Sequence, residues 1–405
     1  MSIQEAAVEL TNPLAYASPS QLHDLMARLR QEKPVCHVSP EGYDPVWLVT
    51  RAEDIRYVEK NPQLFLAGPR TTIGPRSEDN QVDAVGEGAT LVQMDGDTHY
   101  KHRQITQAWF MPKQLRLIEG FVADCAKKFV DLMETKAPAC DFATDVAYWY
   151  PMRVIMTLFG VPEQDDKLIV DLSQQLLGYA DEDVEGNSGM EAILKFYEYF
   201  APIIERCRAN PDDSLASVIA NAEIDGEQIS MESVLGYYLI ICTAGHDTTS
   251  YSTTGGLHAL IQHPEQLQML KDNPDLIPSA VEEMIRWVSP VKHFARTAAE
   301  DVEVGGQKIA KGESLMLLFE SGARDENSLD SPEKFDITRN NERNIAFGFG
   351  AHSCLGRYLA KMEMEAFFRE LLPRLKSVEL DGELRYMASN MVTGPKEMPI
   401  RFEFK

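Results

Sequence analysis

The spacing of apolar and polar residues predicts a protein made mostly of helices. From Thr98 onwards, apolar residues recur every three to four positions, which is the repeat of one face of an α-helix. This periodicity covers Thr98–Phe110, Gln114–Thr135, Pro151–Phe159, Gln164–Tyr179, Glu191–Ala209, Met231–Gln262, Pro264–Lys271, Ile277–Trp287 and Leu355–Leu372. The helix Met231–Gln262 is the longest and is largely apolar in its first half, so we expect it to pass through the centre of the molecule.

A smaller set of segments predicts strands. Val46–Thr50 has the composition of a strand and precedes a short helix, Ala52–Glu59, while Val302–Ile309 and Glu313–Phe319 are further short strands. The stretch Ala67–Thr90 mixes glycine, proline and charges and is too long for an ordinary connection, which is typical of a lid or binding loop. The expected fold class is mainly α with small β-sheets.

Length, charge and cysteine content narrow the class of protein. A chain of 405 residues often divides into domains, but no linker or repeat interrupts this one, so we expect a single domain over residues 1–405. The net charge of -24 disfavours nucleic acids and anionic membranes. No apolar run approaches the roughly 18 residues of a membrane-spanning helix, which favours a soluble, cytoplasmic protein. The six cysteines form no CxxC pair and no four-cysteine cluster for iron and sulfur.

The strongest chemical signal is the segment Phe347–Gly356, which reads F-G-F-G-A-H-S-C-L-G. Its glycines permit a tight turn close to a flat ligand. The helix that follows Cys354 directs backbone N–H groups at the sulfur and so favours the thiolate. A thiolate donates electron density to haem iron and promotes O–O cleavage. A cysteine buried in a glycine-rich turn is the alternative interpretation.

These residues resemble the cytochrome P450 family, and the resemblance covers nearly the whole chain. Within the family, the segments Cys242–Thr249, Arg286–Lys292 and Leu371–Leu380 are most similar to the bacterial soluble, ferredoxin-dependent class, in the branch that contains the terpineol hydroxylase. The resemblance implies the cytochrome P450 fold, with haem b between the long central helix and the cysteine loop. It implies Cys354 as the iron ligand, and haem contacts from Ala244, Phe347, Gly348 and Gly356.

The long helix contains Ala244-Gly-His-Asp-Thr-Thr249, which matches the oxygen-activation motif of the family. A threonine in a helix can bond the carbonyl four residues back and distort the helical ladder. The resemblance makes Thr248 and Asp247 the catalytic residues that deliver protons during dioxygen activation. Without the cysteine motif, the same residues would be interpreted as a polar patch on a helix.

Further charged residues match family positions. Glu283 and Arg286 lie three residues apart on one helical face, and the resemblance makes them a buried structural ion pair beneath the haem. Lys334 stands where an arginine commonly completes this pair, which leaves Arg339 as a substitute. The matches to the residues that bind the haem propionates are His99, Arg103, Arg296 and His352.

The family positions of the substrate pocket are largely apolar here. They are Leu91, Val92, Ile240, Thr243, Ala244, Val291, His293, Met391 and Val392. Such a pocket suits a small hydrophobic substrate held mainly by its shape, namely a terpenoid such as a monoterpene alcohol or an alkyl-aromatic hydrocarbon. The expected reaction is its hydroxylation with O2 and two electrons.

The electrons have to arrive from outside the chain, and the resemblance implies a two-iron ferredoxin with an NAD(P)H-dependent reductase. A basic patch on the thiolate side would receive this acidic partner. Its members would be Lys101, Lys113, Arg116, Arg357 and Lys361. We expect a monomer.

Three alternatives remain open at this point. A peroxide-driven haem-thiolate peroxygenase has less need of the Asp247–Thr248 pair, and a haem-based sensor without catalysis has no use for it. A helical protein with no cofactor would leave the cysteine motif without a purpose.

Overall fold

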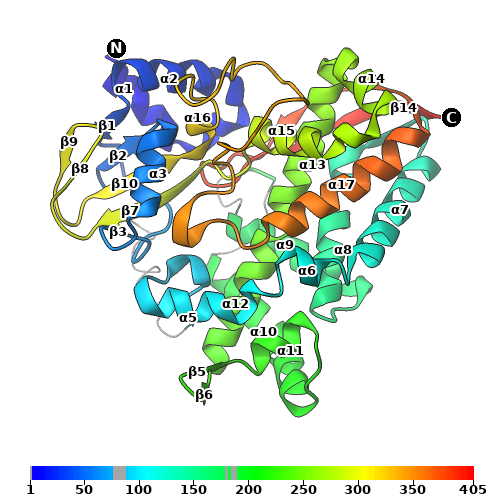
Figure 1. The fold of residues 1–405 in the computed structure, drawn as a ribbon, viewed down its shortest axis with the longest axis horizontal. Coiled ribbons are helices and arrows are strands. Elements are labelled where there is room, and N and C mark those ends of the chain that lie inside the picture. The colour runs from blue at the N-terminus through cyan, green and yellow to red at the C-terminus, as the bar shows by residue number, and fades with distance from the viewer. Residues whose placement is uncertain (1, 76–87, 178–180, 184–188) are drawn as a thin grey trace.

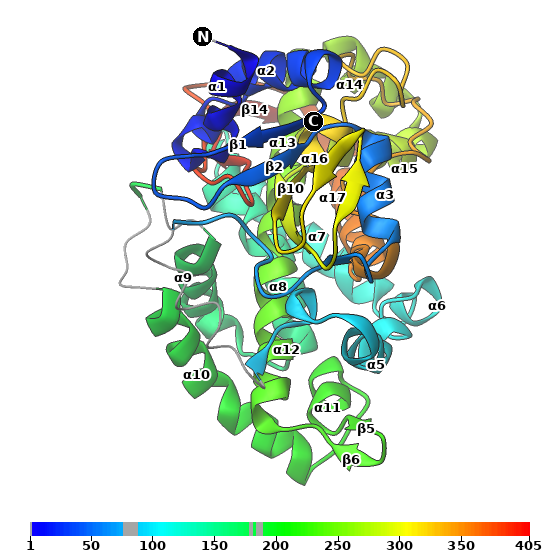
Figure 2. The ribbon, with the colours of Figure 1, turned by 90° about the vertical axis from the view of Figure 1, so that its left-hand side faces the viewer.

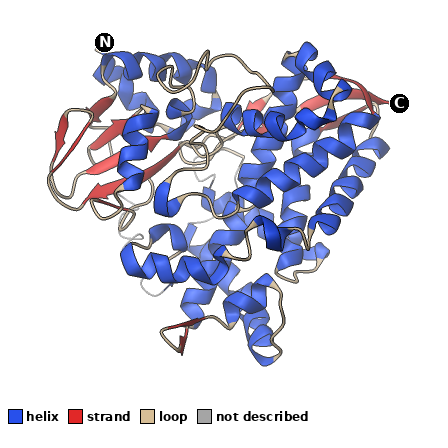
Figure 3. Ribbon diagram, viewed as in Figure 1, coloured by secondary structure: helices blue, strands red, loops and turns tan. Residues whose placement is uncertain are grey.

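The computed structural model describes residues 2–75, 88–177, 181–183 and 189–405. Helices make up most of it, and the largest sheet lies at one side (Figure 3). The helices are α1 (Ile3–Ala7), α2 (Pro19–Glu32), α3 (Ala52–Lys60), α5 (Gly96–Gln107), α6 (Pro112–Leu115), α7 (Glu119–Thr135), α8 (Trp149–Leu158), α9 (Asp166–Leu177), α10 (Gly189–Ala209), α11 (Leu215–Ala220), α12 (Met231–Ala244), α13 (Asp247–Gln262), α14 (Pro264–Asp272), α15 (Ile277–Val288), α16 (Phe319–Gly322) and α17 (Arg357–Arg374).

The strands are short. They are β1 (Val35–Val38), β2 (Val46–Val49), β3 (Phe65–Leu66), β4 (Ala139–Asp141), β5 (Glu223–Ile224), β6 (Glu227–Gln228), β7 (His293–Ala298), β8 (Val302–Val304), β9 (Gln307–Ile309), β10 (Ser314–Leu318), β11 (Leu375–Leu380), β12 (Arg385–Tyr386), β13 (Pro395–Glu397) and β14 (Pro399–Phe404). In the described part of the chain, the largest sheet has the order β1-β2-β10-β7-β3, with only the β2–β10 pair parallel. It lies on the side of α1, α2 and α3 (Figure 1).

The helical side of the molecule is held by apolar stripes that face one another. In α7 the buried positions are Val122, Cys125, Ala126, Phe129, Val130 and Met133, which follow the helical repeat. They face α17, which buries Phe367 and Phe368, and these residues belong to one core cluster. This packing fixes the helix that begins just after Cys354 against the rest of the helical body.

The predicted helix Met231–Gln262 is wrong as one continuous element. It divides into α12 and α13 at Gly245 and His246, and the two helices run one after the other through the middle of the molecule (Figure 2). His246 has φ -117° and ψ -52°, and the Thr248 hydroxyl donates to the Ala244 carbonyl at 3.2 Å. The Thr248 side chain therefore bonds to a carbonyl that the backbone of a regular helix would use. This competition can distort the helix, as expected for a threonine at this position.

Two other predicted boundaries are corrected by turns. The segment Gln114–Thr135 is interrupted after Leu115, because Leu117 and Ile118 make tight i→i−3 backbone bonds before α7 begins. The segment Val302–Ile309 is the hairpin β8–β9 rather than one strand, since Gly305 and Gly306 turn the chain with φ of 54° and 76°. The central part of the predicted lid, residues 76–87, lies outside the described residues. In the parts of the chain that are described, no helix is long and apolar enough to cross a bilayer.

Candidate active site

A deep cavity lies where α12 and α13 face the loop that precedes α17. It contains about 1390 Å³ of space that protein atoms do not fill, part of which opens to solvent. Ala244 and Thr248 line one side, and Cys354 and Leu359 line the other. The two sequence motifs, about a hundred residues apart in the chain, therefore meet across one cavity.

Cys354 presents its sulfur to this cavity. Of the six cysteines, all within the described residues, it alone is exposed, and the surface that it exposes lines the cavity. Its own N–H donates to the Phe347 carbonyl at 2.8 Å, which closes the loop. Because this cavity lies inside the protein, desolvation raises the pKa of the thiol, while the N–H groups of Gly356 and Arg357 and the charge of Arg103 lower it. The start of α17 therefore stabilises negative charge on the sulfur, as the sequence predicts.

Two glycines of the cysteine loop also allow it to pack closely against α3. Gly348 and Gly350 have φ of 66° and 70°, a region that favours glycine. A Cβ on Gly350 would lie 2.3 Å from the carbonyl oxygen of Glu59, and one on Gly348 would lie 3.2 Å from the Glu59 carboxyl. These two glycines let the loop pass close to the end of α3. Gly348 and Gly356 also line the cavity, and Gly356 has open space beside it.

The four predicted propionate partners converge on one wall of the cavity. The rings of His99 from α5 and His352 from the cysteine loop lie 4.0 Å apart between centroids. Arg103, one turn after His99, donates to the Ser353 carbonyl at 2.7 Å, and Arg296 comes from β7. His99, Arg103 and His352 line the cavity directly. Residues from three distant parts of the chain thus form one cationic cluster.

The electrostatics of this cluster fit a ligand with carboxylates. Burial, followed by the charge of Arg296, lowers the pKa of His352 to about 2. Burial and the charge of Arg103 lower the pKa of His99 to about 4. Nε2 of His99 is buried and has no hydrogen-bond partner among the described residues. Because crowded cations and an unpaired ring nitrogen favour bound anions, the cluster suits the two propionates of haem.

The oxygen-activation motif places a polar group on the opposite wall. Thr248 is half-buried and lines the cavity, whereas Asp247 is buried behind it. An Asp247 carboxylate oxygen lies 3.0 Å from Nε2 of the fully buried His246. A Cβ on Gly245 would lie 2.9 Å from Ile155 and 2.7 Å from the Ile241 carbonyl, so the glycine allows α8 to approach the break in the helix.

The predicted ion pair beneath the cavity is present and has a third member. Arg286 donates to both carboxylate oxygens of Glu283, at 2.7 and 2.8 Å, and both residues are fully buried. Nε of Arg339 donates to Glu283 at 3.2 Å, whereas Lys334 is exposed and lies near Asp336. Arg339 supplies the contact for which Lys334 is not positioned.

The predicted substrate residues divide into two groups. Leu91, Val92, Ile240, Ala244 and Val291 line the cavity. Thr243, His293, Met391 and Val392 are not among the residues that line it in this structure, and their contact with substrate stays a prediction.

Each of these four residues has another contact. The Thr243 hydroxyl donates to the Leu239 carbonyl within α12. His293 is fully buried, with Nδ1 2.6 Å from the Asn390 carbonyl and Nε2 accepting from the N–H of Ile73. Met391 and Val392 pack in a small cluster with Tyr148 and Tyr251.

Two acidic residues of the cavity are not predicted by the sequence motifs. Glu59 ends the predicted helix Ala52–Glu59, Glu363 lies within α17, and both residues line the cavity. Burial raises the pKa of Glu363 well above its usual value. For Glu363 a signal was present in the sequence, because it lies on the same helical face as Leu359 and Ala360. Glu59 carries no such signal, since only the fold brings α3 to the cysteine loop.

Comparisons with known proteins agree with this site. The family model of cytochrome P450 matches residues 10–398. Cytochrome P450-terp of a Pseudomonas species is 40% identical over 96% of this chain and 95% of its own length. A steroid C26-monooxygenase of Rhodococcus jostii is 30% identical over 98% of this chain and 84% of its own length.

Solved structures show the same fold. The crystal structure of CYP108D1 from Novosphingobium aromaticivorans has a TM-score of 0.91 and 38% identity, and the match covers 100% of this chain and 98% of that one. CYP268A2 of Mycobacterium marinum, in complex with pseudoionone, has a TM-score of 0.88 and 32% identity, with 95% of both chains covered.

The fold, the cysteine loop and these matches define a haem-thiolate protein. The chain belongs to the cytochrome P450 family and is a monooxygenase that binds haem b. When bound, the haem supplies the iron at which dioxygen is activated, with a cysteine thiolate as its protein ligand.

Proposed function

We propose that this monooxygenase hydroxylates a small hydrophobic substrate of the terpenoid or alkyl-aromatic class, with O2 and two electrons from a two-iron ferredoxin. The observation that carries the proposal is the composition of the cavity. Its lining on the side of α12 and β7 includes Leu91, Val92, Ile240, Val291 and Phe294. Because apolar walls hold a ligand by shape and by burial of its surface, an uncharged hydrocarbon skeleton fits best.

The names of two relatives support this substrate class. Cytochrome P450-terp is 40% identical to the chain, and a structure with a TM-score of 0.88 contains pseudoionone. The steroid C26-monooxygenase, at 30% identity, acts on a larger molecule according to its name. We therefore propose a terpenoid as the first choice of substrate and include a steroid among the compounds tested.

The residues of the site divide the chemical work. Cys354 is the proposed iron ligand, and the N–H groups at the start of α17 hold charge on its sulfur. His99, Arg103, Arg296 and His352 would hold the propionates. Thr248 would offer its hydroxyl to the reacting oxygen, which requires it to leave the Ala244 carbonyl, 3.2 Å away in this structure. Asp247, buried behind it, would return the proton that Thr248 gives up.

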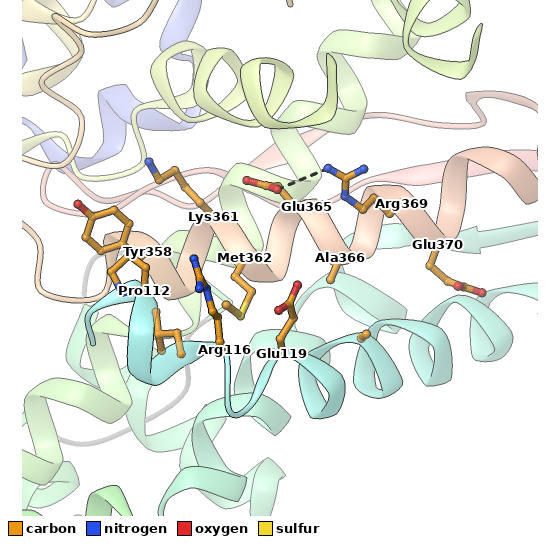
Figure 4. A pocket seen from close by; sticks show the side chains of 12 residues that line it. Pro112, Arg116, Glu119, Tyr358, Lys361, Met362, Glu365, Ala366, Arg369 and Glu370 are labelled. Carbon is orange, nitrogen blue, oxygen red and sulfur yellow. Dashed lines mark ion pairs between the residues drawn. The ribbon is translucent and has the colours of Figure 1, made fainter. Parts of the chain in front are cut away.

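The ferredoxin is proposed to dock on the groove between α6–α7 and α17. Figure 4 shows Arg116 and Glu119 facing Tyr358 and Met362 across this groove. Arg116 is exposed and, within the described part of the chain, forms no ion pair. Leu117 beside it is 75% exposed. A cation next to an exposed apolar side chain suits a partner that is acidic and also buries apolar surface when it docks.

Part of the predicted basic patch is already neutralised. Lys101 lies 2.8 Å from Asp97 and 2.6 Å from Asp225, and Lys361 lies 2.5 Å from Glu282. The proposed docking surface therefore depends on Lys113, Arg116 and Arg357.

A spectral titration tests the substrate class. Monoterpenes, terpene alcohols, alkyl-aromatics and a steroid are added to the ferric protein, and displacement of the iron-bound water is followed by absorbance. Products are then analysed with a surrogate ferredoxin and reductase. We expect tight binding and a hydroxylated product from the terpenoid or alkyl-aromatic set, and a steroid as the only ligand would refute the proposal.

A second experiment tests the donor and its docking face. The rate of reduction by the ferredoxin is measured over a range of salt concentrations for the wild type and for Arg116→Glu with Arg357→Glu, with Lys101→Glu as the matched control. We expect the double variant to slow reduction and to weaken its salt dependence, because attraction between exposed charges is screened by salt. Unchanged rates would exclude this docking face. Turnover with peroxide but none with dioxygen and the ferredoxin would favour the peroxygenase alternative.

A further inference from the structure

Glu59 is a buried acid on the cationic wall of the haem cavity. It lies in the last turn of α3, and its side chain is 2% exposed. Oε1 lies 3.9 Å from Nη2 of Arg296, which is too long for a hydrogen bond. Oε2 has no hydrogen-bond partner in the described residues. The carboxyl group is thus near a cation, yet it is not held in a tight ion pair.

The surroundings of Glu59 come from three elements. The cysteine loop passes over it, where the Phe349 N–H bonds its carboxyl group and the glycines Gly348 and Gly350 pack closely against it. Arg296 faces it from β7, and Arg56 lies on its own helix. Beyond Arg296, the charged and titratable groups of the same wall are His99, Arg103 and His352, and the Asp95 carboxylate acts on both Arg296 and His99.

The balance of these effects leaves Glu59 close to half-protonated at neutral pH. Burial raises its pKa to about 7, against the opposing effects of Arg296 and the Phe349 N–H. A propionate held by Arg296 would be a second anion nearby, and like charges raise the pKa of a carboxyl group further. Any further negative charge in the site would therefore bring a proton onto Glu59.

We propose that Glu59 takes up a proton when the haem iron accepts an electron, so that this one carboxyl group makes the reduction potential depend on pH. The inference rests on the proposed binding of a propionate at Arg296. In the step, iron(III) becomes iron(II) with one electron from the redox partner, and the Glu59 carboxylate takes one proton from water. No bond between heavy atoms forms or breaks. The proton compensates the added negative charge in a region that is shielded from solvent.

The test is a spectroelectrochemical titration of the substrate-free holoenzyme from about pH 5.5 to about pH 9, a range that brackets a carboxyl pKa near 7. Uptake of one proton per electron changes the equilibrium constant for reduction tenfold per pH unit, which sets a limit of about 59 mV per unit for a one-electron couple. We expect the wild-type potential to fall with rising pH below this limit. Glu59→Gln should remove most of the slope. Glu53→Gln, an exposed position on the same helix, is the matched control and should retain it.

An infrared difference spectrum between the reduced and oxidised states gives an independent readout. At a pH near the wild-type midpoint, a protonated carboxyl band should gain intensity on reduction, and Glu59→Gln should lack it. Glu59→Asp should retain a titrating acid with a displaced midpoint. A pH slope and a carboxyl band that both survive in Glu59→Gln would overturn the proposal. If Glu59→Gln binds no haem, absence of the carboxyl band from the difference spectrum of the wild type would overturn the proposal.

The failure of this inference can be separated from failure of the haem site. Arg296→Gln and Arg103→Gln should weaken haem retention and shift the potential if the propionates bind there. If neither does, the proposed propionate site is wrong and the Glu59 proposal is overturned with it. If both do while Glu59→Gln leaves the pH slope unchanged, only the Glu59 proposal is overturned.

Discussion

The third contact of the buried Glu283–Arg286 pair gives a sharp prediction, because the sequence offers two residues for it. Lys334 stands at the family position and Arg339 is the substitute, and the structure places Arg339 against Glu283. Arg286→Gln, Arg339→Gln and Lys334→Gln remove one cation each by the same kind of substitution. Their effects on the free energy of unfolding should therefore differ only through what each side chain contacts.

The expected order follows from burial and from the bonds that are lost. Arg286→Gln removes two charged hydrogen bonds from a carboxylate with no solvent access, and breaking such a pair costs about 3–5 kcal/mol. Arg339→Gln leaves Glu283 with Arg286, the Asp336 N–H and Asn341. It also removes bonds to the exposed carbonyls of Asp330, Ser331 and Lys334, where water can replace the donor, so the bond to Glu283 should dominate a cost of about 1.5–3 kcal/mol. Lys334 is 65% exposed and 3.6 Å from Asp336, and its loss should change stability by less than about 0.5 kcal/mol.

The assay is urea unfolding of the haem-loaded variants, followed by circular dichroism and by the carbon monoxide band of thiolate-ligated haem. The shift in midpoint is converted with the slope measured for the wild type. A loss in Lys334→Gln as large as that in Arg339→Gln would refute the assignment of the third contact.

The remaining predictions concern the cysteine loop, the oxygen motif and one buried histidine. Cys354→Ala should abolish the carbon monoxide band of thiolate ligation, and a surviving band would assign the ligand elsewhere. Asp247→Asn with Thr248→Ala should uncouple oxygen consumption from product, measured as product formed per O2 consumed; unchanged coupling would contradict the proposed relay. Gly350→Ala should impair haem incorporation, measured by the haem-to-protein absorbance ratio, because the new Cβ would lie 2.3 Å from the Glu59 carbonyl at a φ of 70°. Burial lowers the pKa of His293 from 6.5 to about 4, so the folded protein favours the neutral imidazole. Stability should therefore fall by about 3 kcal/mol as the pH drops from 6.5 to 4, and His293→Gln should remove most of that dependence in urea midpoints measured across this range.

The sequence predicted much of the fold because helical periodicity is a local property. The positions of α5, α8, α10, α14, α15 and α17 follow from the spacing of apolar residues alone. The break between α12 and α13 did not follow, although the threonine that contributes to it was recognised. A side-chain bond to the Ala244 carbonyl competes with the backbone ladder, and apolar spacing contains no information about that competition.

The candidate site also contains some residues that local sequence predicts and others that only packing places. Motifs within one segment, such as Phe347–Gly356 and Ala244–Thr249, consist of consecutive residues, so the sequence alone is enough to predict a ligand cysteine and an acid–threonine pair. The lining of the pocket follows less directly from the sequence, because the wall that a residue of a strand or loop joins depends on packing between distant elements. His293 shows this clearly, since its ring bonds to Asn390 and Ile73 instead of lining the cavity.

The amino-acid sequence by itself determined a mainly helical haem-thiolate protein and predicted a proton-delivering motif, because each of those features is encoded by neighbours in the chain. Only the tertiary structure decided which distant groups meet. It brought His99 to His352, Arg339 to Glu283, and the carboxyl group of Glu59 to the cationic wall. The physical reason is that local spacing determines which face of a helix or strand a side chain occupies, whereas the partner on that face is determined by how the elements pack.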